Sequence, residues 1–218
     1  MTADGTRTGR ETRLGEAVRG VRGFVLDADG VLVLQGEPLP GAVDAVRSLE
    51  QRGIPFRVVT NFSQLHRSTL GSWFAKHGLV VDPERIITGT SATAAYVAAT
   101  YPGRPAFVLA ADDARREFDG ATLLDADAAE EAPEGSVAAV VVGDAGDDLS
   151  YRNLDVAFRL VRGGAELLAM HRNPWWLTAR GATLDAGRSW SGSSTRPAGP
   201  HGRLASPRRS SSARPSMA

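Results

Sequence analysis

One stretch decides the fold of this chain, Phe24-Val25-Leu26-Asp27-Ala28-Asp29-Gly30-Val31-Leu32. In it an apolar run is stopped by two carboxylates one residue apart, and a glycine and further apolar residues follow. A continuous apolar run predicts a parallel strand that is covered on both faces. Ligands of open α/β sheets bind at the carboxyl ends of such strands. We therefore expect Asp27 and Asp29 to lie where chemistry takes place.

The two carboxylates raise an electrostatic problem if they are held close together. Residues two apart on a strand share a face, so Asp27 and Asp29 repel each other, and one pKa rises unless a cation lies between them. A divalent metal ion with oxygen ligands would relieve this repulsion. Asp-Ala-Asp-Gly is also typical of a surface turn, and the stretch alone does not decide between a site and a turn.

A second strand favours the site. The apolar run Phe56–Val59 ends in Thr60-Asn61, and the intervening chain has room for one helix between two parallel strands. The two motifs together resemble those of the haloacid dehalogenase superfamily, in which most members are magnesium-dependent phosphohydrolases. The segments 143–146, 149–154 and 169–172 are similar to a capped subgroup of that family, so the resemblance covers residues 22–187.

The resemblance implies a role for four residues. Asp27 would be the nucleophile that forms an aspartyl phosphate, and Asp29 would be the general acid and base. Mg²⁺ would be held by the Asp27 carboxylate and the Asp29 backbone carbonyl. Thr60 would donate its hydroxyl to the phosphoryl group of a small phosphorylated substrate, beside the backbone amide of Asn61. The alternative for Thr60 and Asn61 is an ordinary transition from strand to turn.

Strand and helix patterns alternate along the chain, as in a doubly wound α/β fold. Strands are expected at 24–26, 56–60, 86–87, 107–110, 137–142 and 166–170. Five helices are expected. The first starts at Ala42, the second includes Leu70, Trp73 and Phe74, and the third runs through Tyr96; the fourth and fifth span 112–118 and 151–161. Thr90 or Ser91 would cap the third of these helices, and the acidic run 125–134 is interpreted as a solvated loop rather than a metal site.

These patterns divide the chain into four parts. We expect a loose leader at 1–20, the N-terminal part of a parallel, Rossmann-like core at 21–101, an inserted α/β cap at 102–187 and a disordered low-complexity tail at 188–218. The cap is implied by the resemblance, because periodicity alone does not separate it from a continuation of the same sheet. The core is then incomplete.

The tail lacks the residues that the family would require there. Beyond Asp185 the chain contains no Asp, Glu or Lys, whereas the family resumes its core domain with a lysine and an acidic pair. Read in an alternative frame with free codon choice, residues 192–198 can give Leu-Glu-Tyr-Ala-Thr-Gly, and 209–214 can give Val-Val-Val-Gly-Lys, as in relatives. A frameshift near Gly187 or Arg188 accounts for both segments. The alternative is coincidence, since free codon choice is permissive.

Composition limits the remaining function classes. A hydrophobic share of 42% suffices for a core, and a formal net charge of zero provides no overall field for nucleic acid or an anionic membrane. Cysteine is absent, and residues 1–20 lack the apolar centre of a secretory signal. We therefore expect a cytoplasmic protein that binds neither nucleic acid nor membrane. A homodimer is compatible with this expectation. The six arginines of the tail resemble a nucleic-acid arm and are interpreted as out-of-frame noise.

Further residues are candidates for substrate contact. His171 and Arg172 follow a strand and could contact substrate, although a lone histidine is more often structural. Trp175 and Trp176 could stack on a ring, although paired aromatics usually pack in a core. The leading function is a magnesium-dependent phosphatase impaired by loss of its C-terminal motifs. The alternatives are a non-catalytic remnant or binding protein, and a phosphorylation-receiver domain.

Overall fold

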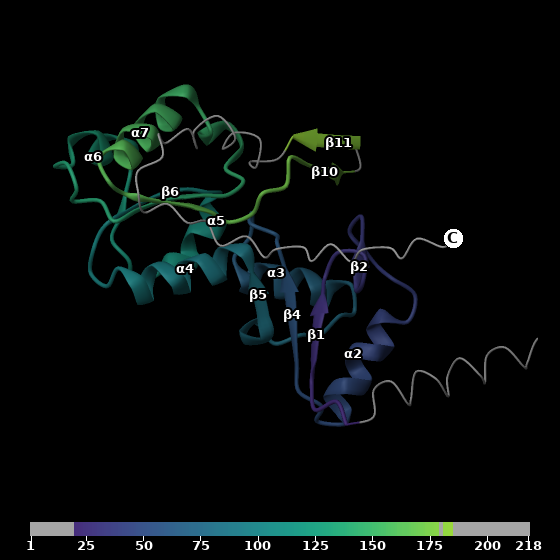
Figure 1. Ribbon diagram of the computed structural model, residues 1–218. Coiled ribbons are helices and arrows are strands. Elements are labelled where there is room, and N and C mark those ends of the chain that lie inside the picture. Colours follow the sequence, from purple (N-terminus) through teal and green to yellow (C-terminus); the bar gives the residue numbers. More distant parts are fainter. Residues whose placement is uncertain (1–19, 179–180, 185–218) are drawn as a thin grey trace, which may run out of the picture.

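The computed structural model describes residues 20–178 and 181–184, which form two separate parallel sheets (Figure 1). The first sheet has the order β1-β4-β5, with strands β1 (Phe24–Asp27), β4 (Phe56–Thr60) and β5 (Ile86–Thr88). Helices α2 (Ala42–Gln51) and α3 (Arg67–Lys76) connect them, and the hairpin of β2 (Val33–Leu34) and β3 (Glu37–Pro38) follows β1. The expected positions of these three strands and two helices are confirmed.

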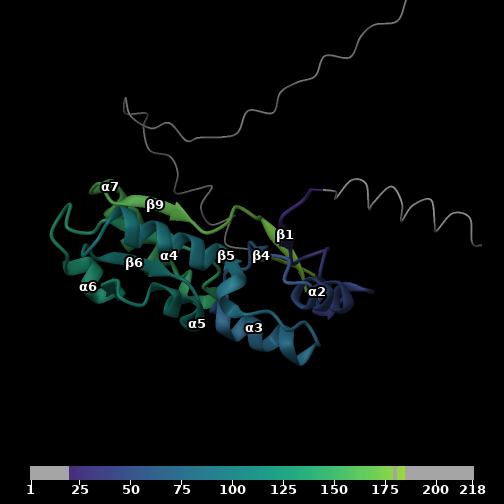
Figure 2. The same ribbon diagram turned by 90° about the horizontal axis from the view of Figure 1, so that it is seen from below.

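Both helices of this first unit pack on the same face of its sheet. Alternation along β4 turns Phe56 and Val58 inward, where they join side chains of α2, α3 and β5 in one buried cluster. Figure 2 shows α2 and α3 together below the strands. The opposite face carries Val25 and Ile87, which are 72% and 39% exposed. The expectation that β1 is covered on both faces is therefore wrong for the described residues, because β1 is an edge strand with helices on one side.

The second unit has the layered arrangement that the first lacks. Its sheet has the order β7-β6-β8-β9 and is parallel throughout, with strands β6 (Ala106–Leu109), β7 (Leu123–Leu124), β8 (Ala139–Val142) and β9 (Glu166–Ala169). One face is covered by α4 (Gly89–Thr100), α5 (Asp112–Arg115) and the 3-10 turn η2 (Arg116–Phe118). The other is covered by α6 (Ala126–Glu131) and α7 (Tyr151–Arg162). All residues of β6 and β8 are buried, as expected for central parallel strands.

The mixed α/β class with parallel sheets is thus confirmed, and the second unit corresponds to the expected cap. Helix α4 precedes the boundary expected at residues 101 and 102. Its buried residues Ala94 and Val97 nevertheless pack against β6, β8 and Phe118 of the second unit. By packing, the second unit therefore begins with α4.

Local chemistry corrects several details. The N-cap of α4 is Thr88, whose hydroxyl accepts from the Ser91 amide while the Ser91 hydroxyl accepts from the Thr88 amide, both at 2.9 Å. Ser91 therefore completes a capping box, and neither Thr90 nor Ser91 is the cap itself. The acidic run is not a continuous loop, because the Asp125 side chain caps α6. The helix expected at 112–118 is one α-helical turn continued as a 3-10 turn.

The remaining elements are short. They are the 3-10 turns η1 (Pro83–Arg85) and η3 (Gly146–Asp148) and the hairpin of β10 (Trp175–Thr178) and β11 (Gly181–Leu184). None of the helices in the described part of the chain combines the length and apolar composition needed to cross a bilayer. The expectations for residues 1–19 and for the tail, including the frameshift, lie outside the described residues.

Candidate active site

The acidic stretch lies at the carboxyl edge of the first sheet. Asp27 is the last residue of β1, and the Ala28 amide next to it donates to the Val59 carbonyl of β4 at 3.0 Å. The chain then turns: Val33 N donates to Ala28 O at 2.9 Å, and Gly30 adopts a φ of +76° that favours glycine. Asp-Ala-Asp-Gly is therefore a turn, as one interpretation proposed. This turn is also what holds both acids at the strand end.

Thr60 occupies the equivalent end of the neighbouring strand. It is the last residue of β4 and is 8% exposed, and its hydroxyl accepts from the Phe62 amide at 3.2 Å. Because β1 and β4 are parallel neighbours, their carboxyl ends meet at one edge. Asn61 follows with an exposed side chain. The structure thus brings together the two motifs that are far apart in the sequence.

The pKa of Asp29 is raised above its ordinary value. The main cause is desolvation by the surrounding protein, and the second is repulsion from the Asp27 carboxylate. A hydrogen bond from the Thr60 side chain acts in the opposite direction. The repulsion that the sequence predicted is therefore present, although burial is the larger effect. A carboxyl with a raised pKa keeps its proton at a higher pH, as a proton donor requires.

A cleft of about 630 Å³ opens between the two units at this edge. Asp29, Thr60 and Asn61 line it from the first unit, and Asp144, His171 and Asn173 line it from the second. Asp27 is exposed and does not line the cleft, because the alternation of β1 turns it to the same side as Val25. Three of the four predicted site residues therefore share one cavity, and the fourth adjoins it.

The second unit holds the loop that follows Thr60. Ser63 is 3% exposed, and its hydroxyl lies 2.9 Å from His171 Nε2 and accepts from the Asp144 amide at 3.2 Å. The Gln64 side chain donates to the Asp144 carboxylate. His171 thus has the structural role of holding Ser63, and because it lines the cleft, its contact with substrate stays a prediction. Arg172 is exposed and lies outside the cleft lining.

Sequence reasoning missed several cleft residues. Asp144 and Asn173 come shortly after β8 and β9, so the strand-end rule that selected Asp27 and Thr60 could have found them. Trp73, on α3, also lines the cleft. It was assigned only to a helix core, because no local pattern indicates that it faces a second unit.

Two carboxylates of the second unit close the amino end of α3. Asp113 accepts from the His66 amide at 2.8 Å and from the Thr69 hydroxyl at 3.2 Å. Glu117, whose side chain is 1% exposed, accepts from the Arg67 amide at 2.6 Å. Negative charge is favourable at a helix amino terminus. These contacts fix the orientation of the second unit over the first.

We expect Asp113→Asn to lower the free energy of unfolding by about 1 kcal/mol at pH 7. This is a typical loss when a charged hydrogen-bond acceptor is replaced by a neutral amide that can still accept some of the same hydrogen bonds. Burial disfavours ionisation of Asp113, but the His66 amide, Arg116 and Thr69 hold its pKa below the ordinary value of 3.8. A lowered pKa adds stability above the unfolded pKa, and this stability is lost as the pH falls through the folded pKa.

Urea unfolding at pH 7 and at pH 3 or below measures this effect. The difference between wild type and Asp113→Asn should shrink at acid pH, while the exposed neighbour variant Asp112→Asn should differ little from wild type at either pH. A deficit of Asp113→Asn that is independent of pH would contradict the assignment.

The donor set fits part of a hard cation's shell. The Asp27 carboxylate and the Asp29 backbone carbonyl lie at one strand end, and a divalent ion there would also relieve the repulsion between the Asp27 and Asp29 carboxylates. Within residues 20–178 and 181–184, no group of three or more His, Cys, Asp or Glu side chains is arranged to hold a metal.

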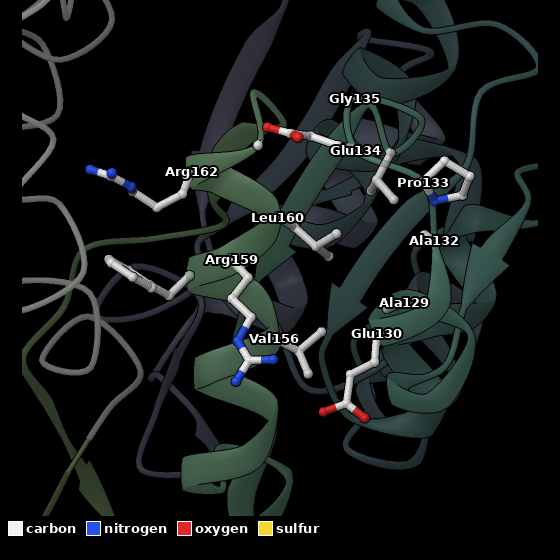
Figure 3. A pocket seen from close by; sticks show the side chains of 13 residues that line it. Ala129, Glu130, Ala132, Pro133, Glu134, Gly135, Val156, Arg159, Leu160 and Arg162 are labelled. Atoms are coloured by element: carbon white, nitrogen blue, oxygen red, sulfur yellow. The ribbon is translucent and has the colours of Figure 1, made fainter.

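A second cavity, of about 440 Å³, lies between α6 and α7 on the outer side of the second unit (Figure 3). Glu130 and Ala132 line it from the α6 side, and Val156, Arg159 and Leu160 line it from α7. None of the predicted site residues lines this cavity. The 630 Å³ cleft is therefore the candidate active site.

A parallel α/β fold with two acids at a strand end is compatible with more than one function, and comparison with known proteins narrows the choice. Residues 24–123 match the family model described as haloacid dehalogenase-like hydrolase. The phospholysine phosphohistidine inorganic pyrophosphate phosphatase of Bos taurus is 30% identical over 179 residues, which make up 79% of this chain and 62% of that protein. The dihydroxyacetone phosphatase of Corynebacterium glutamicum is 30% identical over 145 residues, or 66% of this chain and 50% of that protein.

Solved structures agree with these matches. A hypothetical protein from Pyrococcus horikoshii aligns with a TM-score of 0.73 and 27% identity, covering 78% of this chain and 66% of that one. Over residues 24–123 the chain is similar to haloacid dehalogenase-like hydrolases. It spans about three-fifths of the length of the curated bovine relative.

Proposed function

We propose that the protein is a magnesium-dependent phosphohydrolase that acts on a small phosphorylated compound through an aspartyl phosphate. The observation that carries the proposal is the cleft in which Asp29, Thr60 and Asn61 meet beside Asp27. The raised pKa of Asp29 supports its role as acid. Two relatives are named as phosphatases. One is a dihydroxyacetone phosphatase, and the other is a phospholysine phosphohistidine inorganic pyrophosphate phosphatase. Both names support a small phosphorylated substrate.

The proposed reaction has two displacements at phosphorus. An Asp27 carboxylate oxygen forms a bond to phosphorus as the bond to the leaving oxygen or nitrogen breaks, and the Asp29 carboxylic acid gives its proton to the leaving atom. The Asp29 carboxylate then takes a proton from water, whose oxygen attacks the aspartyl phosphate, so that inorganic phosphate leaves and Asp27 is regenerated. Solvent exposure of Asp27 is compatible with attack from the strand end.

The phosphoryl oxygens need positive partners during both steps. The Thr60 hydroxyl and the Asn61 backbone amide, at the end of β4, would donate hydrogen bonds to them. Asp27 and Asp29 would bind the magnesium ion, which supplies charge neutralisation on the phosphoryl oxygens. The residue that the family uses to neutralise the remaining charge is a lysine. Beyond Asp185 the sequence contains no lysine and no acid, so we propose that this chain is impaired.

A non-catalytic remnant or binding protein is the second candidate. The described residues favour it in one respect, since they contain no cluster of three metal-binding side chains. A phosphorylation-receiver domain is the third. Magnesium-dependent phosphate release from an aryl phosphate, measured beside labelling by acetyl phosphate, separates the three. Measured on the frame-restored protein, release supports the phosphatase, a stable adduct without release supports the receiver, and neither supports the remnant.

A further inference from the structure

The charges that line the cleft are negative. Of its described lining residues, Asp29 and Asp144 carry carboxylates, and none is a lysine or arginine. Asp29 belongs to the proposed phosphoryl chemistry. Asp144 comes from the second unit and has no part in that chemistry. It therefore contributes a second negative charge to the cavity that must receive the rest of the substrate.

The Asp144 charge is not neutralised by the groups that surround it. Its carboxylate accepts hydrogen bonds from the Gln64 side-chain amide and, at 3.2 Å, from the Gly146 backbone amide. Both donors are neutral, and no ion pair of Asp144 occurs within the described residues. Asp144 is half-buried, so it is partly shielded from water by the walls of the cleft. Such a group repels an anion and attracts a cation at short range.

Aromatic side chains line the same cleft. They are Phe62, Trp73, Phe74 and Trp175. Trp73 is held against Phe74 and His77, with ring centroids 5.5 and 4.4 Å apart, while Trp175 is 58% exposed and so offers free ring surface. The faces of Trp and Phe attract cations, and aromatic pockets of this kind bind quaternary ammonium groups.

His171 is the remaining cleft side chain that can carry positive charge. Its Nε2 atom lies 2.9 Å from the Ser63 hydroxyl, and Ser63 also accepts from the Asp144 amide. This nitrogen is thus engaged with the loop that follows Thr60. The other ring nitrogen, Nδ1, is buried.

We infer that the cleft selects phosphorylated compounds whose leaving group carries an ammonium charge, held by Asp144 and the neighbouring aromatic faces. For the phosphate end of the ligand the inference rests on the proposed function. For the ammonium end it rests on Asp144 and the aromatic residues, which have no part in the proposed phosphoryl chemistry. Compounds with a second anionic group, such as a carboxylate or another phosphate, bind poorly because Asp144 repels them.

The test compares two ligands that differ only in charge. Phosphocholine and 3,3-dimethylbutyl phosphate have the same shape, but only the first has a quaternary ammonium group. Isothermal titration of the full chain in magnesium buffer should give about tenfold tighter binding of phosphocholine, a ratio within reach of a cation–π contact added to a partly buried ion pair. Asp144→Asn should remove the preference, because its amide can still bond Gln64 and Gly146 but has no charge.

Controls separate the two ends of the ligand. Asp147→Asn, an exposed acid of η3 outside the cleft lining, should keep the preference, and Trp175→Leu should weaken it. Choline and 3,3-dimethylbutanol repeat the comparison without phosphate. If the phosphate esters bind no better than these alcohols, the proposed function fails while the cation preference is still decided. The inference is overturned if the charged and the neutral compound bind equally well in both pairs, the esters and the alcohols. It is also overturned if the preference for the charged compound survives Asp144→Asn.

Discussion

Restoring the alternative reading frame after Gly187 is expected to raise magnesium-dependent phosphate release from an aryl phosphate by several orders of magnitude. In the family, the missing lysine neutralises charge between nucleophile and phosphoryl group, and the missing acids hold magnesium. Loss of a buried partner charge costs about 3–5 kcal/mol, and each 1.36 kcal/mol added to a barrier is a factor of about ten in rate. The assay compares the two proteins at equal concentration, with EDTA as the magnesium control.

The same pair of proteins should differ in association. Val25 and Ile87 lie on the face of the first sheet that α2 and α3 leave open, at 72% and 39% exposure. Exposed apolar faces favour association, so gel filtration of the chain with its present tail should show oligomers or aggregates, and the restored protein should elute as one sharp species. If the present chain is monodisperse and matches the restored protein in rate, the frameshift and the missing-motif explanation are both wrong.

Asp29→Asn in the frame-restored protein should lower turnover by about two to four orders of magnitude, the usual loss for one proton-transfer group. Magnesium affinity should change much less, because the proposed metal contact of Asp29 is its backbone carbonyl, which the substitution keeps. Turnover by phosphate release and magnesium affinity by titration calorimetry give the two values. Near-normal turnover would remove Asp29 from the mechanism, and a parallel loss of both would make its carboxylate a metal ligand.

The sequence predicted strand ends better than it predicted burial. Phe24-Val25-Leu26 and Ala139–Val142 are both continuous apolar runs, yet β8 is buried throughout while Val25 of β1 is 72% exposed. The difference depends on strand order and on which face each helix covers, and these are non-local properties. Local rules can indicate that a hydroxyl residue caps a helix but not which one when several are close together. Here the expected cap was Thr90 or Ser91, and the observed cap is Thr88.

The site was predictable to the extent that it depends on strand ends. Asp29, Thr60 and Asn61 were placed in one site from two motifs, and they line one cleft. Asp144 lies after β8 and carries the same signal. Trp175 was named as a possible stacking group, whereas Trp73 was assigned only to a helix core. That both line one cleft depends on how the two units pack together (Figure 1), which no local pattern predicts.

The central claim is that Asp27 is the phosphoryl acceptor, and one measurement tests it most directly. Wild type, Asp27→Asn and the exposed control variant Asp119→Asn are incubated with acetyl phosphate and magnesium, and intact mass spectrometry under acidic conditions, where acyl phosphates persist, records the adduct. We expect one phosphoryl group on wild type and on Asp119→Asn, and none on Asp27→Asn. Equal labelling of all three proteins, or labelling of none, would contradict the assignment.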